Sequence, residues 1–375
     1  MSDLPSTMRS LVAPKFCTPS KYEVVDMPLP TIKNPHDVLI RVHACGIQTG
    51  DTQIARGMTR ILPGKMKFPM KIGIEGSGVV AAVGTAVTKF RAGDEVYTLA
   101  QPGRPMDLFA AVGFASQYAV SPEACVLAKP AGLPHEDAAS LAGLTLTAYQ
   151  AAEAGVRLLR EGSGHDGDGG LEGKTAFVPG ALGGAGSVAV QLLKNHYGVG
   201  RVVATVSTAK VPLVERLLPG LVDQVVDYTA TPRLADAVPA GSVDFVLNTQ
   251  RDLAAAVPLV RRGGGGVVVS ISSLPRPALF REMLPSAPFW VLWLLAAAQW
   301  YYAFLLRGTG IRYTFVSGNF GIREDVERVG EFIATGKVKA VKRVVDLEDI
   351  RAVREGCEQV YTGKGGVGKL VIKIP

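Results

Sequence analysis

The residues with the clearest chemical signature are glycines at the start of a predicted helix. Residues 175–191 read TAFVPGALGGAGSVAVQ, a short apolar strand followed by a glycine-rich turn and a helix. Glycines allow a sharp turn and a close approach of the backbone to a pyrophosphate, which binds the N–H groups at the helix start. The cofactor-binding residues predicted in this turn are Leu182, Gly183, Gly184 and Ala185.

The next strand indicates which dinucleotide binds. NAD sites usually carry an Asp or Glu at the end of the second strand. Here residues 205–210 read TVSTAK and contain no carboxylate. The Ser207 hydroxyl and the Lys210 ammonium suit a 2′-phosphate, which predicts NADPH. Ser207 can equally be an ordinary N-cap, and both interpretations are compatible because a helix N-terminus itself attracts anions.

Two other stretches resemble a phosphate-binding loop and a metal site, respectively, but neither fits well. Residues 363–369, GKGGVGK, resemble a phosphate-binding loop, but Leu370 replaces the required Ser/Thr and no helix can follow. We interpret them as a turn into a terminal strand. Residues 161–170 contain His165, Asp166 and Asp168 among many glycines, which favours a solvated loop over a metal site.

The flanking sequence predicts the elements that position these residues. Segments 38–44, 73–84 and 90–98 indicate a β-rich first part, followed by a helix over 135–154. Strands and helices then alternate, which is typical of a parallel, doubly wound sheet. After residue 323 we expect two amphipathic helices and a last strand, KLVIKI.

Composition narrows the class of protein. Apolar residues make up 47% of the 375 residues and charged residues 19%, as in a globular chain large enough for two domains. The net charge of +7 is spread without a dense basic run, so we expect no nucleic-acid partner. The four cysteines are far apart, and the N-terminal residues resemble no targeting signal, which predicts a cytoplasmic location.

These motifs in this order resemble the medium-chain dehydrogenase/reductase superfamily, and most closely its zinc-free quinone oxidoreductase and enoyl reductase branch. The resemblance lies in VHACGIQTGDTQIARG, GIEGSGVVAAVG, FRAGDEVYT, GLTLTAYQAA, the glycine turn and GKLVI. It implies an α/β protein in which a Rossmann domain (136–318) with a doubly wound parallel sheet accompanies a GroES-like, β-rich catalytic domain (1–135 and 319–375).

The resemblance also implies roles for individual residues. Ser207 and Lys210 match 2′-phosphate ligands, Tyr228 matches a tyrosine at the adenosine end, and Thr147 matches a threonine near the nicotinamide. The strand-end residues expected to flank the nicotinamide cleft are Asn248, Ser270 to Ser272, Phe315 and Val316.

Departures from the superfamily pattern exclude its catalytic zinc. Gln48, Ile74 and Gly143 stand where zinc alcohol dehydrogenases have Cys, His and Cys, and a catalytic zinc needs three protein ligands. Gln48 can still donate a hydrogen bond to a carbonyl. Gln53 replaces the tyrosine that usually serves as the candidate proton donor.

One apolar segment is long enough to cross a membrane. Phe289–Leu306 is interrupted only by Gln299 and contains all three tryptophans of the chain. A span would separate strands that must join one sheet. Two other interpretations stay open: a helix buried in protein, either at a dimer contact or over the active site, and a helix on a membrane surface.

The sequence therefore predicts a zinc-independent, NADPH-dependent reductase of quinones or α,β-unsaturated carbonyls. Gln48 is the expected donor to the acceptor oxygen, and we expect a hydrophobic acceptor and a homodimer. The alternative is a cofactor-binding, membrane-associated or interaction protein with little turnover, which the loss of tyrosine at Gln53 favours.

Overall fold

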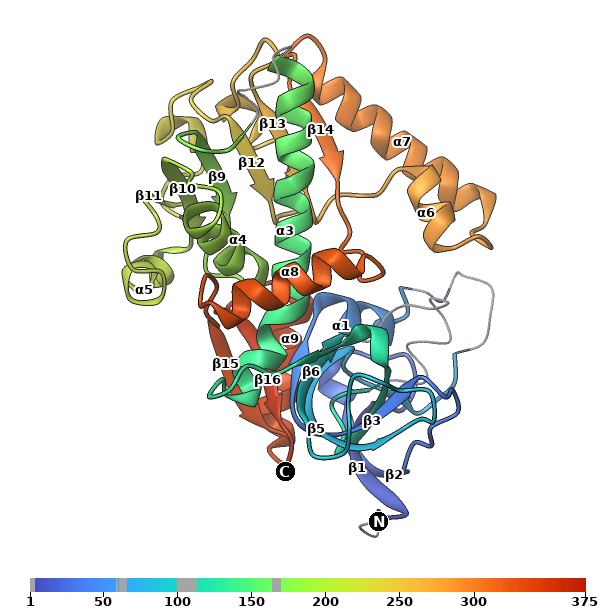
Figure 1. The fold of residues 1–375 in the computed structure, drawn as a ribbon. Coiled ribbons are helices and arrows are strands. Elements are labelled where there is room, and N and C mark those ends of the chain that lie inside the picture. Colours follow the sequence, from blue (N-terminus) through green and yellow to red (C-terminus); the bar gives the residue numbers. More distant parts are fainter. Residues whose placement is uncertain (1–3, 59, 61–65, 100–112, 164–169) are drawn as a thin grey trace. The chain divides into compact units, whose positions relative to one another are not determined.

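The structure, a computed structural model, describes residues 4–58, 60, 66–99, 113–163 and 170–375 (Figure 1). The residues His165, Asp166 and Asp168 lie outside these ranges. The chain divides into two compact units. Unit 1 comprises residues 1–143, 320–334 and 342–375, and unit 2 comprises residues 144–319 and 335–341.

The units differ from the sequence-based division, which began the Rossmann domain at 136 rather than 144 and assigned all of 319–375 to the catalytic domain. Residues 335–341 belong to unit 2. Helix α4 (Gly184–Asn195) holds them through Gln191, whose Nε2 donates to Lys339 O at 2.9 Å and whose Oε1 accepts from Lys339 N at 2.7 Å. Asn195 adds a bond to the Lys337 carbonyl at 2.8 Å. Side-chain amides of α4 thus bind the backbone of residues 335–341, and the sequence pattern gave no sign that this stretch belongs to unit 2.

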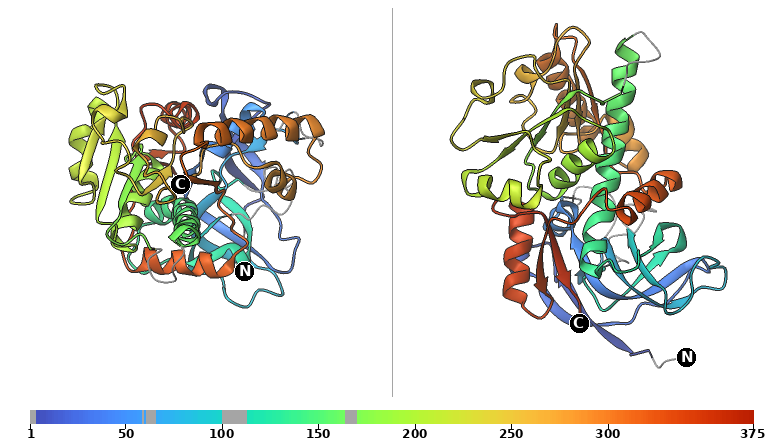
Figure 2. Two further views of the ribbon diagram at one scale, coloured as in Figure 1. Left: turned by 90° about the horizontal axis from the view of Figure 1, so that it is seen from above. Right: turned by 60° about the vertical axis from the view of Figure 1, so that its left-hand side comes forward.

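Unit 2 is built on a parallel sheet of short, apolar strands. The strands are β9 (Thr175–Pro179), β10 (Arg201–Val206), β11 (Gln224–Asp227), β12 (Phe245–Asn248), β13 (Val267–Ser270) and β14 (Arg312–Phe315). Their order is β11-β10-β9-β12-β13-β14, and every neighbouring pair is parallel. The right-hand view of Figure 2 shows the twist of this sheet. The direction of winding reverses between β9 and β12, so the predicted doubly wound Rossmann fold is confirmed.

The helices that flank or connect these strands in the sequence are α3 (His135–Ser163), α4, α5 (Val211–Leu217), α6 (Pro277–Met283) and α7 (Phe289–Leu306). Of these, α3 precedes β9, α4 and α5 connect β9, β10 and β11, and α6 and α7 connect β13 to β14. The helix predicted over 135–154 is confirmed and continues to Ser163, and the division between the units falls inside it, after Gly143. Phe177, Val246 and Val268 are fully buried members of the unit 2 core.

Unit 1 is the β-rich unit that the sequence predicts. One sheet has the order β2-β1-β4, and a larger sheet has the order β15-β16-β3-β5-β6-β8, with β7 paired to β3. The strands are β1 (Thr7–Ala13), β2 (Glu23–Pro28), β3 (Asp37–Ile47), β4 (Met70–Lys71), β5 (Glu75–Val83), β6 (Glu95–Leu99), β7 (Tyr118–Pro122), β8 (Val126–Ala128), β15 (Lys342–Asp346) and β16 (Lys369–Lys373).

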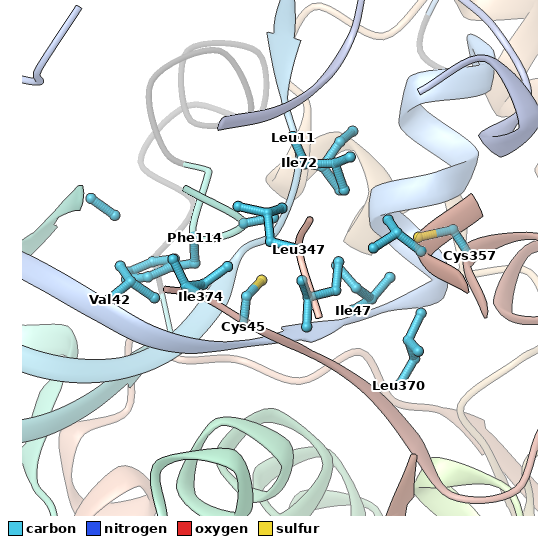
Figure 3. Close-up of a cluster of buried hydrophobic side chains, with 14 of the residues drawn as sticks. Leu11, Val42, Cys45, Ile47, Ile72, Phe114, Leu347, Cys357, Leu370 and Ile374 are labelled. Carbon is cyan, nitrogen blue, oxygen red and sulfur yellow. The ribbon is translucent and has the colours of Figure 1, made fainter. Parts of the chain in front are cut away.

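Three helices complete unit 1. They are α1 (Thr49–Arg56), α8 (Arg323–Ala334) and α9 (Ile350–Thr362). The close-up in Figure 3 shows its buried core, in which Cys45 and Ile47 of β3 lie near Ile374, Leu347 and other apolar side chains. The predicted turn into the last strand is confirmed, because Gly363 ends α9 with a left-handed φ of 69° and β16 begins at Lys369.

Candidate functional site

The glycine turn of unit 2 connects β9 to α4 by close backbone packing. Gly180 has a φ of 73°, which only glycine adopts easily, and its N–H donates to the Thr205 carbonyl and hydroxyl, both at 3.1 Å. A Cβ at Gly186 would lie 2.2 Å from the Gly180 carbonyl oxygen. The helix can therefore approach the strand only because residue 186 is glycine.

The start of α4 is suited to an anion. Gly183 is the N-cap and has no side chain to occupy the first N–H groups of the helix. Gly184 and Ala185 are half-buried, whereas Leu182 is almost completely buried, so Gly184 and Ala185 are better placed than Leu182 to face a ligand. Backbone N–H groups and the helix dipole together favour a phosphate here.

The residues predicted for the adenosine end of the site lie after β10 and β11. Ser207 follows β10 as the N-cap of a short 3-10 turn that ends at Lys210, and both side chains are half-buried. Burial lowers the pKa of Lys210. Tyr228 follows β11 and is 53% exposed. This arrangement offers a cation, a hydroxyl and an aromatic ring along the carboxyl ends of two neighbouring strands.

A carboxylate also approaches this turn. Asp227 accepts from the backbone N–H groups of Thr229 at 2.9 Å and Ala230 at 3.3 Å. A hydrogen bond from the Thr208 side chain is the main cause of its lowered pKa, so the group is ionised and engaged in its own turn.

The strand-end residues predicted near the nicotinamide are buried and bonded to each other. Asn248 Nδ2 donates to Ser270 Oγ at 3.1 Å and to Gln250 O at 2.7 Å, and neither Asn248 nor Ser270 is exposed. Ser270 Oγ also accepts from the backbone of Ser273 at 3.1 Å. These side chains fix the loops at the carboxyl edge of the sheet. Phe315 and Val316 are half-buried at the end of β14.

In unit 1 the predicted donor Gln48 lies at the start of α1. Its backbone N–H donates to Asp51 Oδ2 at 2.8 Å, and its side chain is half-buried. Asp51 is buried, and burial raises its pKa to about 7 even though the Gln48 N–H and Lys369 oppose the shift. Gln53 is half-buried one turn further along α1.

A buried ion pair behind Gln48 is a feature that sequence reasoning missed. Lys369 Nζ pairs with Glu75 Oε1, and both side chains are almost completely buried. The Glu75 carboxylate also accepts from the Gly143 backbone at 3.2 Å. Gly46 lies between the two strands that carry the pair, and a Cβ there would come within 3.0 Å of Glu75 Oε1. The only sequence signal was that Glu75 and Lys369 each begin a mostly apolar strand that lies next to glycines.

The positions of the superfamily's catalytic zinc ligands do not fit a metal. Gln48 and Ile74 are half-buried, and Gly143 is buried and uses its backbone N–H to bind Glu75. Within the ranges that the structure describes, no three His, Cys, Asp or Glu side chains gather to hold a metal ion. Zinc independence rests on these residue types and stays a prediction. Thr147 lies on the part of α3 that belongs to unit 2 and is half-buried.

The Rossmann fold of unit 2 and the glycine turn between β9 and α4 are features of a nucleotide-binding protein. Two family models match this chain. The alcohol dehydrogenase GroES-like domain matches residues 34–131, and the zinc-binding dehydrogenase domain matches residues 222–372. The chain belongs to the medium-chain dehydrogenase/reductase superfamily.

Curated relatives and solved structures agree with this assignment. The chain is 33% identical over 215 residues to the mitochondrial NAD(P)H oxidoreductase RTN4IP1 of Mus musculus, a match that covers 54% of this chain and only 49% of the mouse protein. It is 27% identical to the mitochondrial reticulon-4-interacting protein 1 of Caenorhabditis elegans, over 98% of this chain and 95% of that protein.

A plant relative and a solved structure complete the comparison. The chloroplastic NADPH-dependent alkenal/one oxidoreductase of Arabidopsis thaliana is 31% identical over 69% of this chain and 60% of its own length. The quinone oxidoreductase of Coxiella burnetii shares the fold with a TM-score of 0.72 at 21% identity, over 98% of this chain and all of that one. The organelles in the relatives' names are theirs; the cytoplasmic location of this chain stays a prediction.

Proposed function

We propose that this protein is a zinc-independent oxidoreductase that uses NADPH to reduce a quinone or an α,β-unsaturated carbonyl. The observation that carries the proposal is the carboxyl edge of the unit 2 sheet, where β9 leads into a glycine-capped helix and β10 is followed by Ser207 and Lys210 rather than by a carboxylate. The names of the mouse and Arabidopsis relatives, an NAD(P)H oxidoreductase and an NADPH-dependent alkenal/one oxidoreductase, support the reaction class.

In this proposal the residues of unit 2 bind and orient the dinucleotide. The N–H groups at the start of α4 receive the pyrophosphate, and Lys210 and Ser207 receive the 2′-phosphate. Asn248 and Ser270 act indirectly, because their mutual hydrogen bond holds the loops beside the nicotinamide. NADPH, when bound, supplies the hydride.

The residues of unit 1 act on the acceptor. Without a metal, the oxygen of the acceptor must be stabilised by hydrogen-bond donors, and the Gln48 side-chain amide is the donor that we propose. Its backbone is fixed by Asp51 at the start of α1. Gln53 has no acidic proton to give, so after hydride reaches the β-carbon of an enone, solvent protonates the α-carbon; for a quinone, solvent protonates the oxygen.

The cofactor part is tested by Lys210→Ala. Loss of one charge-assisted contact to the 2′-phosphate should weaken NADPH binding by about tenfold or more and leave NADH binding nearly unchanged. Arg262→Ala is the matched control, because Arg262 is an exposed cation of unit 2 that precedes β13 and lies away from the carboxyl edge of the sheet. Equal losses for both dinucleotides in calorimetry would refute the NADPH preference.

The acceptor part is tested by following NADPH oxidation with a panel of quinones and enones. Turnover of at least one class is expected, and Gln48→Leu should lower kcat/KM by about a hundredfold or more, as loss of an oxyanion donor does. Binding of NADPH without turnover of any acceptor would favour a cofactor-binding protein with little activity.

A further inference from the structure

The outer face of α7 is an apolar surface that the rest of the chain leaves uncovered. Trp293 is 75% exposed, Trp300 81% and Phe304 72%, and Phe289 and Leu294 are exposed to a similar degree. Figure 1 shows α7 along the outer side of unit 2, beyond the edge strand β14. Among the described helices it is the one long and apolar enough to cross a membrane, and only 22% of it is buried.

The inner face of the same helix is fixed to unit 2. Gln299, its one polar amide, turns inward, and its Nε2 donates to the carbonyls of Leu274 at 3.0 Å and Pro275 at 3.2 Å. The Tyr302 hydroxyl accepts from the Leu274 N–H at 3.2 Å, and its ring lies 5.3 Å from that of Tyr313 on β14.

These anchors argue against a transmembrane helix. The strands before and after α7, β13 and β14, pair with each other in one sheet. Insertion of α7 across a bilayer would break the contacts of Gln299 and Tyr302 and pull on both strands. The second half of the helix is therefore held against its own unit, with one side free.

The free side has the composition of a membrane–water interface. It exposes tryptophan in both halves of the helix, and Tyr301 is 54% exposed beside Trp300. Tryptophan and tyrosine concentrate at the level of lipid headgroups, where the ring is in an apolar layer and its N–H or O–H reaches a polar one. At roughly 150–250 Å² per aromatic side chain, this face exceeds the few hundred Å² of the largest apolar patch on an ordinary monomer.

The charges at its borders indicate an anionic partner. Arg281 precedes the helix, Arg307 follows it, and Arg276 adjoins Pro275, whose carbonyl is bonded to Gln299 in the second half of the helix; all three are exposed, against the single acidic residue Glu282. A second copy in an antiparallel, two-fold contact would bring Arg307 of one chain toward Arg281 of the other, which is repulsive. Anionic headgroups instead complement both ends.

We propose that the outer face of α7 docks on the surface of a bilayer that contains anionic lipid, with the helix in the plane of the interface. The aromatic side chains enter the boundary between headgroups and acyl chains, and the arginines at both ends contact lipid phosphates. The protein body takes the place of the polar face that an isolated interfacial helix would need. This inference does not depend on the reaction proposed above.

Tryptophan fluorescence of the full chain reports on this helix alone, because Trp290, Trp293 and Trp300 are the only tryptophans. Vesicles of phosphatidylcholine with phosphatidylserine should shift the emission to shorter wavelength and carry the protein upward in flotation. Vesicles of pure phosphatidylcholine should bind it about tenfold or more weakly, since each basic residue near an anionic surface contributes several-fold.

The variant Leu294→Glu/Phe304→Glu keeps all three tryptophans and places charge on the exposed face. It should lower vesicle binding by about tenfold or more, because charged side chains are costly at membrane depth. Ile322→Glu/Val344→Glu is the matched control, since both residues are 42% exposed apolar positions of unit 1. It should bind vesicles as the parent does, and equal NADPH binding by all three proteins would show that they are folded.

Three results would overturn the proposal. One is a dimer whose tryptophan emission is already at short wavelength without lipid and which Leu294→Glu/Phe304→Glu dissociates, because the homodimer expected from the sequence would then cover the face. Another is membrane association that survives alkaline carbonate, which indicates a span. The third is a monomer that does not bind anionic vesicles, by either tryptophan emission or flotation.

Discussion

The polar sites of the two units consist of different chemical groups. Unit 2 presents backbone N–H groups at the start of α4, made accessible by glycines and surrounded by half-buried side chains. Unit 1 uses ionisable side chains that are buried behind Gln48: Asp51, Glu75 and Lys369. A backbone site is sensitive to steric bulk, whereas a buried charge cluster is sensitive to the loss of a partner and to pH.

The largest effect should come from Lys369→Met, which leaves the Glu75 carboxylate buried without its counter-ion. Removal of one partner of a buried ion pair costs about 3–5 kcal/mol of unfolding free energy. The measurement is chemical denaturation at neutral pH. The double variant Glu75→Gln/Lys369→Met removes both charges and should regain most of the loss. If the double variant were as unstable as the single one, packing rather than charge would explain the effect.

Asp51→Asn should change how stability depends on pH. The folded pKa of Asp51, about 7, lies above its ordinary value of 3.8, so the folded protein binds this proton more tightly than the unfolded chain does. The unfolding free energy of the parent should therefore fall as pH rises through this window and level off above it. Asp51→Asn should lack that decline, which in the parent should amount to a few kcal/mol of unfolding free energy at most. Parallel pH profiles for the two proteins would contradict the raised pKa.

In unit 2, the addition of a single methyl group should lower both stability and dinucleotide affinity. Gly186→Ala places a Cβ 2.2 Å from the Gly180 carbonyl oxygen, and the forced separation of α4 from β9 should cost about 1–3 kcal/mol. Dinucleotide affinity should fall with it, because the N–H groups move. Gly183→Ala is the matched comparison, since its Cβ would be 3.2 Å from the same oxygen. Its loss in calorimetry and thermal unfolding should be the smaller, and a reversed ranking would refute the packing argument.

Chelation should have no effect. Gln48, Ile74 and Gly143 offer no ligand set for zinc, so purified protein should contain substoichiometric zinc, and a chelator should leave NADPH oxidation unchanged. Metal analysis that found one tightly bound zinc per chain would overturn this prediction and would point to residues outside the described ranges.

Much of unit 2 could be predicted from sequence because its information is local. The short apolar strands β9, β10, β12 and β13 and the glycine turn each lie within a few residues of their own signals, and the structure confirms them. The apolar segment 289–306 forms one helix with the predicted bounds. Its exposure could not be read from composition, because a helix that is apolar on all sides gives no direction for its buried face.

The features of unit 1 that were not predicted depend on pairing between residues far apart in the sequence. β15 was not predicted, and its place in the sheet comes from parallel pairing with β16. The ion pair of Glu75 and Lys369 joins residues from opposite ends of the chain, which meet only because β16 pairs with β3 and β3 pairs with β5. No local pattern encodes such a contact.

The position of β16 also has a consequence for biosynthesis. The strand lies inside the unit 1 sheet, between β15 and β3, yet the whole of residues 144–319 is translated after β3 and before β16. On the ribosome, unit 2 can therefore begin to fold while residues 44–47 of β3 still lack their partner strand β16 and Glu75 still lacks its cation. A strand that is made before unit 2 thus completes its pairing only after unit 2 has been made, and until then its unpaired end is open to edge-to-edge association.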